Sequence, residues 1–209
     1  MENSGEPLRK NHSADGGADI TFKGELLRKA THLGALAIPA IYYFTGEKVI
    51  IPLLLATLTL SLSVDMIRFY GGPKSKQLIQ RLFGIMIRPH EKRDFTGATY
   101  ILSSSIITIL IFDKMIAILA IAYIAVGDTA GAIVGKLWGR IRFRNKTLEG
   151  SISFFLSCCL VSLGITGPEL SIRVLGAFVA AAVEALTTNI DDNMTVPLIS
   201  GAAMQLIAG

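Results

Sequence analysis

The chain has 209 residues, of which 51% are hydrophobic and only 17% are charged, and its mean hydropathy is +0.54. This composition is too apolar for an ordinary soluble domain. A formal net charge of +4 can indicate nucleic-acid binding. Here, however, the basic residues lie where lipid headgroups or a nucleotide would meet them, so we expect no nucleic-acid partner.

Residues 1–22 are polar and rich in glycine and aspartate. They lack the apolar segment that a cleavable signal peptide requires, and we expect them to form a disordered tail. The rest of the chain, residues 23–209, is predicted to form a single membrane-embedded domain.

Seven apolar runs are separated by short polar segments, at residues 33–46, 49–67, 97–112, 115–134, 151–167, 170–188 and 194–208. Several are shorter than the roughly 20 residues that a straight transmembrane helix needs, so some helices must extend into flanking polar residues. The third and fourth runs are the least clearly separated, because only Asp113 and Lys114 lie between them. We therefore predict an all-α, polytopic membrane protein with about seven transmembrane helices.

Basic residues are distributed unequally between alternate connections. Five Lys and Arg precede the first run, seven lie between the second and third, and five lie between the fourth and fifth. The opposite connections contain only Lys48, Lys114 and Arg173. Because basic residues accumulate on the cytoplasmic side, we expect a multi-pass integral membrane protein with a cytoplasmic N-terminus and an external C-terminus.

The most informative motif is Gly127-Asp128-Thr129, which follows the apolar run Met115–Val126. An ionisable residue at the end of a membrane-length apolar run is costly to place, so we interpret Asp128 as a functional residue. By the predicted topology, it lies toward the cytoplasmic face.

Glycines recur at every fourth position after this motif, at Gly131, Gly135 and Gly139. This spacing is first of all a device for close packing between membrane helices. A nucleotide-binding P-loop is excluded, because that motif needs four residues between its glycines and Ser or Thr after the lysine. The chain has three intervening residues, and Leu137 follows Lys136. Lys136 and the bases of the following loop are still candidate phosphate contacts.

At the entrance of the first run, His32 shares a helical face with Glu25 and the pair Arg28-Lys29, because their offsets are three, four and seven residues. The two bases are either membrane anchors or phosphate contacts. A histidine on an apolar face is more often a hydrogen-bonded core residue than a catalytic one, so the pattern leaves both roles open for His32.

Acidic residues lie at the same predicted level in other runs. Asp65 precedes Arg68 by three residues and is either its local partner or part of a site. Asp191 and Asp192 either cap the last helix or belong to the site. Glu184 lies well inside its run and indicates a polar stripe that lines a cavity.

Residues 75–87, before Pro89, place apolar side chains at helical spacing among basic ones. This pattern predicts an amphipathic helix in the headgroup plane, which is also suited to guide a lipid toward the site.

Carboxylates and bases at one membrane face suit a divalent metal and a nucleotide polyphosphate. Mg²⁺ is usually held by one or two carboxylates together with phosphate oxygens, and phosphoryl transfer asks a protein mainly for positioning and charge neutralisation. The substrate that explains a membrane location is a lipid alcohol.

Four motifs occur in order: E-x-x-R-K-x-x-H from Glu25, G-D-T-x₅-G-x₃-G from Gly127, K-T-L-E-G-S from Lys146 and D-D-N-x-T-V-P-L from Asp191. Together they resemble the CTP-dependent polyprenol kinase family, which includes dolichol kinase, phytol kinase and a CTP-using diacylglycerol kinase. The chain is similar to the short members. The resemblance implies transfer of the γ-phosphate of CTP, with Mg²⁺, to a membrane isoprenoid alcohol such as a polyprenol, dolichol, phytol or geranylgeraniol. It is compatible with a homo-oligomer.

The site that we expect on this basis has three groups of residues. The catalytic candidates are Asp128, Glu149, Glu184 and His32; the nucleotide contacts are Arg28, Lys29, Lys136, Lys146 and Asn193; the metal ligands are Asp128, Asp191 and Asp192. Which acid serves as base and which as ligand is left open at this point.

Two other classes of function share part of this pattern. A cytidylyltransferase that forms CDP-lipids carries a similar G-D-T/G segment followed by K-T-x-E-G, but the chain lacks the C-terminal signature of those enzymes. A small transporter also needs intramembrane acids, yet its polar groups would continue past the midplane. In this chain they stop on one side, which favours the kinase.

Overall fold

A computed structural model describes residues 30–84, 94–144, 146–187 and 190–209. The described part confirms the all-α prediction apart from one small hairpin. Its elements are α2 (Ala37–Thr45), α3 (Glu47–Tyr70), α4 (Pro73–Phe83), α5 (Gly97–Ile111), α6 (Lys114–Trp138), β1 (Arg142–Phe143), β2 (Lys146–Thr147), α7 (Leu148–Gly164), α8 (Leu170–Leu186) and α9 (Asp192–Ala208).

Each of the seven apolar runs coincides with helical structure. The first covers α2 and part of a short helical segment at residues 30–34, and the third and fourth are separated by a helix break at Phe112 and Asp113, as predicted. Within the described ranges, α3 and α6 are long and apolar enough to cross a membrane, whereas α5 and α7 are shorter apolar helices. The number of spans therefore stays a prediction.

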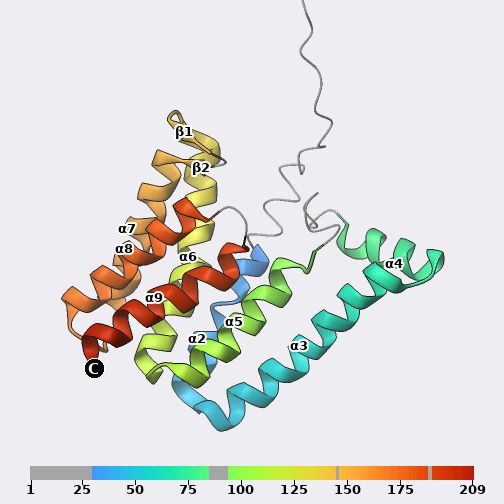
Figure 1. Cartoon of the computed structure of the whole chain (residues 1–209), viewed down its shortest axis with the longest axis horizontal. Helices are drawn as coiled ribbons and strands as arrows, with labels where there is room; N and C mark the ends of the chain where they lie inside the picture. Colours follow the sequence, from blue (N-terminus) through green and yellow to red (C-terminus); the bar gives the residue numbers. More distant parts are fainter. Residues whose placement is uncertain (1–29, 85–93, 145, 188–189) are drawn as a thin grey trace, which may run out of the picture.

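Helix α6 lies at the centre of the bundle and packs against α2, α5, α7, α8 and α9. Its middle is fully buried, from Ile116 to Ala125, and these side chains join two hydrophobic clusters on either side of the helix. Among the described elements, helix α3 makes its main contacts with α2, α4 and α5. It diverges from the rest of the bundle (Figure 1). The apolar surface of α3 is therefore mostly exposed, as a lipid-facing helix requires.

The polar ends of several helices lie on one side of the molecule. In Figure 1 the β1–β2 hairpin, the C-terminal end of α8 and the N-terminal ends of α5 and α9 are all at the upper side, away from the C-terminus of the chain. The opposite end contains Lys48, Lys114 and Arg173. For the basic residues that the structure describes, it thus gives the same two groups as the sequence does.

Glycines bring α6 and α7 into backbone contact. A Cβ atom at Gly150 would lie 2.8 Å from the carbonyl oxygen of Gly131, and one at Gly135 would lie 2.7 Å from the Thr147 hydroxyl oxygen. No side chain larger than hydrogen fits between helices at this separation. The glycine spacing therefore serves close helix packing, as the sequence indicates.

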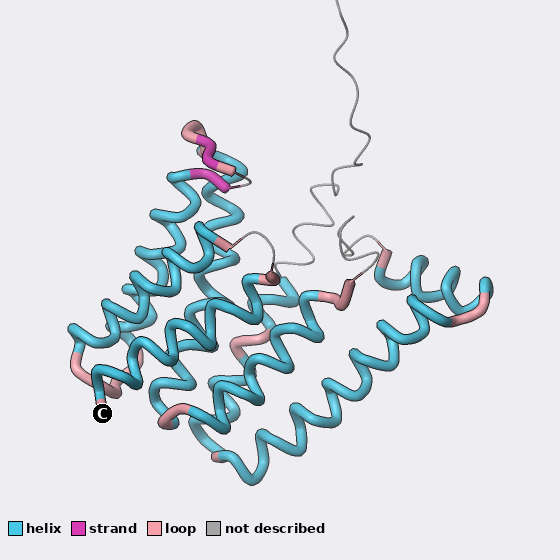
Figure 2. The backbone as a smooth tube through the Cα atoms, in the orientation of Figure 1, coloured by secondary structure: helices cyan, strands magenta, loops and turns pink. Residues whose placement is uncertain are grey.

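A two-stranded antiparallel hairpin connects α6 to α7, with Arg142 paired to Thr147 and Phe143 paired to Lys146 (Figure 2). The sequence indicates only a basic loop in this segment. Strands of two residues are too short to show the alternation of polar and apolar side chains by which strands are predicted. The hairpin directs Lys146 back toward the bundle.

The predicted amphipathic helix at residues 75–87 corresponds to α4, which ends at Phe83. Leu78 and Leu82 are exposed, whereas Ile79 is buried. The last part of the predicted helix, at residues 85–87, lies outside the described residues, as does the expected disordered tail at residues 1–22.

We predict that Gly150→Ala destabilises the protein by about 1–3 kcal/mol, because the added methyl group meets the α6 backbone, which cannot shift without separating the helices. Thermal or denaturant unfolding in detergent measures the change. Gly164→Ala is the matched control, since Gly164 is also in α7 but has open space around it. The control should be neutral or slightly stabilising, and equal losses in the two variants would contradict the packing argument.

Candidate functional site

A buried histidine–aspartate pair lies where the helical segment at residues 30–34 meets α6. Nδ1 of His32 is 3.2 Å from Oδ2 of Asp128, and both side chains are 7% exposed. A carboxylate beside one imidazole nitrogen fixes the orientation of the ring and stabilises its protonated form. The sequence predicts both residues separately as catalytic candidates, and the fold brings them together.

The neighbouring backbone of α6 is seated by α7. A Cβ atom at Gly127 would lie 2.6 Å from the ring of Phe154, so only glycine allows the ring to pack beside Asp128. Phe154 is fully buried and belongs to the larger hydrophobic cluster. The Gly-Asp pair of the motif therefore has two separate functions. Gly127 leaves room for the Phe154 ring, and Asp128 supplies the carboxylate that faces His32.

A second polar cluster centres on Lys146 of β2. Its Nζ atom lies 2.5 Å from Oε1 of Glu184 in α8 and 3.1 Å from Oδ2 of Asp192 in α9. Glu184 is almost completely buried, whereas the Lys146 side chain is 28% exposed. The ammonium group thus joins the hairpin to two helices and neutralises two acids that the sequence predicts as parts of a site.

Burial and charge have opposite effects on Lys146. Burial alone would lower its pKa, but the carboxylates of Asp192 and Glu184 outweigh burial, so the pKa lies above the ordinary value of 10.5. Asp128 adds a smaller upward effect on this pKa. The histidine–aspartate pair and the Lys146 cluster are therefore electrostatically coupled parts of one region.

The start of α9 shows that both interpretations of its acids have a basis. Oδ1 of Asp191 accepts hydrogen bonds from the backbone N–H of Asn193 at 2.9 Å and from its side-chain amide at 2.7 Å. Asp191 is therefore the N-cap of α9. The Asn193 carbonyl accepts a hydrogen bond from Ser104 of α5, at 2.7 Å. The proposed ligand role of Asp191 and the nucleotide role of Asn193 stay predictions.

Other predicted site residues are placed differently. The Glu149 carboxylate accepts hydrogen bonds from the backbone N–H groups of Arg140 and Ile141, at 3.0 and 3.2 Å, and so closes the base of the hairpin. This contact gives Glu149 a structural role beside the predicted catalytic one. Lys136 lies in the last turn of α6 with an exposed side chain. Arg28 and Lys29 lie outside the described residues.

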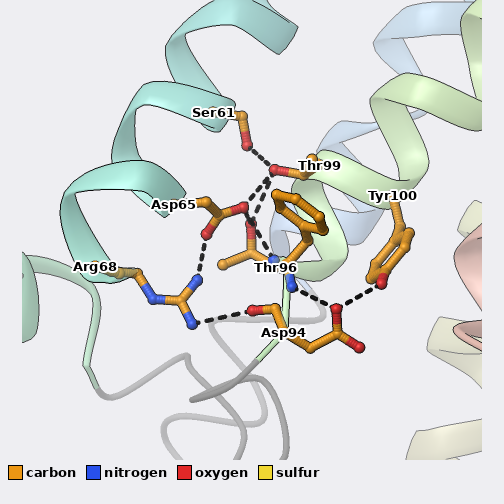
Figure 3. Close-up of polar contacts among 8 residues, drawn as sticks. Ser61, Asp65, Arg68, Asp94, Thr96, Thr99 and Tyr100 are labelled. Carbon is orange, nitrogen blue, oxygen red and sulfur yellow. Dashed lines mark hydrogen bonds and ion pairs between the residues drawn. The ribbon is translucent and has the colours of Figure 1, made fainter. Parts of the chain in front are cut away.

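A third polar network joins α3 to α5 and is centred on Asp65, which is fully buried. Arg68 donates to one carboxylate oxygen; the other accepts from the Thr96 backbone N–H and hydroxyl, both at 3.1 Å, and from the Thr99 hydroxyl at 2.7 Å (Figure 3). Thr96 is the N-cap residue of α5. An acid of α3 therefore caps α5, and its charge also favours this helix N-terminus. The pairing with Arg68 confirms the local-partner interpretation of Asp65.

Asp94 and Tyr100 extend this network, and the sequence analysis does not single them out. The Asp94 carboxylate accepts from the Phe95 N–H and from the Tyr100 hydroxyl, each at 2.8 Å, and the Asp94 carbonyl accepts from Arg68 (Figure 3). A Thr directly before an apolar run is a recognised helix-start signal, so this signal could have identified Thr96 beside Asp65 and Arg68.

The donor set around Lys146 fits a metal–nucleotide complex better than a metal cage. Among the described residues, no three His, Cys, Asp or Glu side chains converge closely enough to hold an ion by themselves. Two buried acceptor oxygens, Oε2 of Glu184 and Oδ1 of Asn193, have no hydrogen-bond partner in the part of the chain that the structure describes. One or two carboxylates with phosphate oxygens are the usual surroundings of Mg²⁺, and the carboxylates of this region suit that arrangement.

Comparison with known proteins gives the relationship of the whole chain. CTP-dependent diacylglycerol kinase 1 of Schizosaccharomyces pombe is 28% identical over 208 residues, which cover 88% of this chain and 94% of the relative. The chain is homologous to this kinase. The protein of the same name from Eremothecium gossypii is also 28% identical, over 90% of this chain and 69% of its own length. An uncharacterised protein of Rickettsia prowazekii is 26% identical over 85% of the chain.

No protein-family model matches the chain, and no solved structure matches it significantly. The homology to the two kinases nevertheless confirms the resemblance to CTP-dependent lipid kinases that the four motifs indicate. It extends over most of the chain and is therefore independent of any single motif.

We predict that Lys146→Met destabilises the protein by about 1–3 kcal/mol, because two carboxylates lose their cation. The pKa of Lys146 is raised in the folded protein, so its contribution is complete below pH 10.5 and is lost only as the pH rises through the higher value. Thermal unfolding in detergent should give a constant difference between variant and parent from neutral to mildly alkaline pH. Adding Glu184→Gln should recover part of the loss, and a difference that disappears by pH 9 would contradict the raised pKa.

Asp65→Asn should cost about 3–5 kcal/mol, because it removes the charge that neutralises the buried guanidinium of Arg68. The double variant Asp65→Asn/Arg68→Met should recover most of the loss, since the pair is then replaced and not broken. Asp94→Asn is the control in the same network, and its exposed carboxylate should matter much less. The argument is wrong if the double variant is as unstable as the single one in the same unfolding measurement.

Proposed function

We propose that the protein is a membrane-embedded kinase that transfers the γ-phosphate of CTP to the hydroxyl group of a lipid. The homology to CTP-dependent diacylglycerol kinase 1 carries this proposal, because it covers nearly the whole length of both chains. It implies a phosphotransferase that acts on a lipid hydroxyl. The joined polar clusters supply charged groups of the kinds that phosphoryl transfer requires.

His32 and Asp128 form the acceptor side of the proposed site. With its Nδ1 atom 3.2 Å from the Asp128 carboxylate, a neutral imidazole that is protonated on Nδ1 would carry its lone pair on Nε2, where it is suited to accept the proton of a hydroxyl. Asp128 would orient the ring and stabilise the imidazolium that forms. Of the four predicted catalytic residues, this assignment gives His32 and Asp128 roles in the reaction. It leaves Glu184 as a partner of Lys146.

Lys146 and the basic hairpin form the phosphate side. The Lys146 ammonium stays protonated at physiological pH, because its pKa is raised. Arg140 and Arg142 belong to the same connection between α6 and α7, are exposed, and are suited to meet the polyphosphate. Mg²⁺ would enter as the complex with CTP, with Asp128, Asp191 or Asp192 completing its oxygen ligands, and it would neutralise charge on the phosphates.

The acceptor lipid has two candidates. Two relatives bear the name CTP-dependent diacylglycerol kinase 1, which favours diacylglycerol. An isoprenoid alcohol such as geranylgeraniol, phytol or a polyprenol is favoured by the resemblance of the motifs to polyprenol kinases. A primary alcohol with a single chain also needs a narrower lateral opening than two acyl chains.

The proposed topology has seven spans and a site on the cytoplasmic side. It is supported by the segregation of basic residues to the end that contains the hairpin, α4 and the start of α9. Cysteine labelling from each side of sealed vesicles at the hairpin and at the C-terminus tests it. Labelling of the hairpin from outside would overturn the proposal.

The test of the activity uses purified protein, Mg²⁺ and labelled nucleotide with each lipid in turn. Label from the γ-position of CTP should appear in a lipid monophosphate, and unlabelled CTP should compete better than ATP, GTP or UTP. If only label from the α-position enters the lipid and pyrophosphate is released, the protein is a cytidylyltransferase. If no label enters any lipid alcohol, the proposed kinase function is wrong.

Asp128→Asn should lower kcat about 100-fold or more, because the variant loses the carboxylate that orients His32 and favours its charged form. Turnover with the preferred lipid measures the loss. Asp113→Asn makes the same chemical change at an exposed position between α5 and α6, and its turnover should match the parent. Near-normal turnover of Asp128→Asn in folded, membrane-inserted protein would remove Asp128 from the mechanism.

A further inference from the structure

An apolar groove lies below the histidine–aspartate pair, between α2, α6 and the end of α7. Its volume is about 340 Å³, and its walls include Leu36, Pro39, Phe44, Ile118, Ala122 and Gly164. Within the part of the chain that the structure describes, no charged side chain lines it. The groove belongs to none of the three polar networks.

The groove is aligned with the proposed acceptor side of the site. Leu36 follows His32 by four residues, about one helical turn. On α6, Ala122 and Ile118 precede Asp128 by six and ten residues, which places them about 9 and 15 Å from Asp128 along the helix axis. Leu36 therefore places one end of the groove about a turn from His32, whereas on α6 the groove lies on a neighbouring face, turned about 80–120° from Asp128, and continues away from the pair.

Gly164 forms part of the far end of the groove. Helices α6 and α7 run antiparallel: the Cys158 thiol donates to the Tyr123 carbonyl, and a Cβ at Gly167 would touch Met115. Gly164 therefore lies near the level of Ile118, well below Asp128. No atom of the described residues lies within 4 Å of the position that a Cβ atom would take there, so a larger side chain at residue 164 has room to enter the groove.

We propose that this groove holds one apolar chain of the lipid substrate while its hydroxyl group meets His32 and Asp128. The inference rests on the proposed function. The occupant is a hydrocarbon chain because the walls are aliphatic and aromatic, and it is the substrate's chain because the groove continues from the acceptor side. A diacylglycerol would place one chain in the groove and leave the other in the bilayer.

The groove should act on selectivity more than on affinity. Bilayer lipid is as apolar as the groove wall, so a chain gains packing contacts and little hydrophobic free energy when it moves from one to the other. A chain too short to reach the level of Ile118 makes none of the contacts near Gly164. Chain length is therefore the variable that distinguishes this groove from an ordinary lipid-facing surface.

The kinetic test compares Gly164→Phe with the parent on short and long substrates of one class: geraniol against geranylgeraniol, or dioctanoylglycerol against dioleoylglycerol. We expect KM for the long substrate to rise about fivefold or more, with the short substrate unchanged. Leu156→Phe is the matched control, because Leu156 is exposed on α7 outside the groove. Equal effects on both substrates, or no effect on either, would overturn the proposal.

A second measurement does not depend on turnover. A long-chain alcohol with a photoreactive diazirine near its tail end should label peptides that contain Phe44 or Ala122. Labelling should be lost in Gly164→Phe. An excess of the unlabelled alcohol should reduce labelling of the parent protein, whereas a bilayer phospholipid should not. Competition by the phospholipid, or unchanged labelling in the variant, would show that the groove holds only bulk bilayer lipid. An inactive parent protein that still shows specific labelling would overturn the kinase function and keep the groove.

Discussion

The close approach of α6 and α7 is the contact on which the site depends. Glycines on both helices let the backbones meet, and the two helices carry the residues that matter on either side of that contact. Asp128 lies three residues before Gly131 on α6, and Lys146 lies in β2, four residues before Gly150 and directly ahead of the start of α7. Because the crossing fixes the two glycines against one another, it also fixes the aspartate and the lysine in one region. A looser crossing would separate the phosphate side of the proposed site from the acceptor side.

Charge neutralisation inside an apolar bundle is the second constraint. An ionised group without a partner is costly there, so each acid needs a partner close by. Asp128 has His32 from the helical segment at residues 30–34, and Glu184 has Lys146 from the hairpin. In these two cases the partner comes from a different element. The contacts that stabilise these two acids therefore also bring distant parts of the chain to the polar end.

The sequence predicts the helices well, because an apolar run in a membrane protein leaves the backbone few alternatives to a helix. It also identifies Asp128, Glu184 and Asp192 one by one as acids within or beside apolar runs, and Lys146 as a base of the K-T-L-E-G-S motif. It does not show that Lys146 pairs with both acids. That pairing joins residues far apart in the chain, and no local spacing encodes it.

Other features escape prediction for local reasons. The hairpin is too short for a periodic pattern, and the acceptor role of Glu149 toward the backbone of Arg140 depends on the turn that the hairpin makes. The contacts of Tyr100 depend on where Asp94 lies, and neither residue has a distinctive spacing. Asp191 is only partly predictable, because an acid at the start of a helix can be either a cap or a metal ligand. The fold shows that it is the cap.

The cap of α5 by Asp65 has a consequence for the connection between α3 and α5. A helix usually takes its N-terminal cap from its own chain just upstream, which ties the length of the preceding loop to the helix start. Here the capping carboxylate belongs to α3, so the start of α5 is set by two packed helices. Insertions between Phe83 and Asp94 would leave the capping atoms in place, and the entropic cost of a longer connection grows only slowly with its length. This connection is therefore the natural place for an epitope, a fusion partner or a lineage-specific extension on the side of the molecule that carries the site.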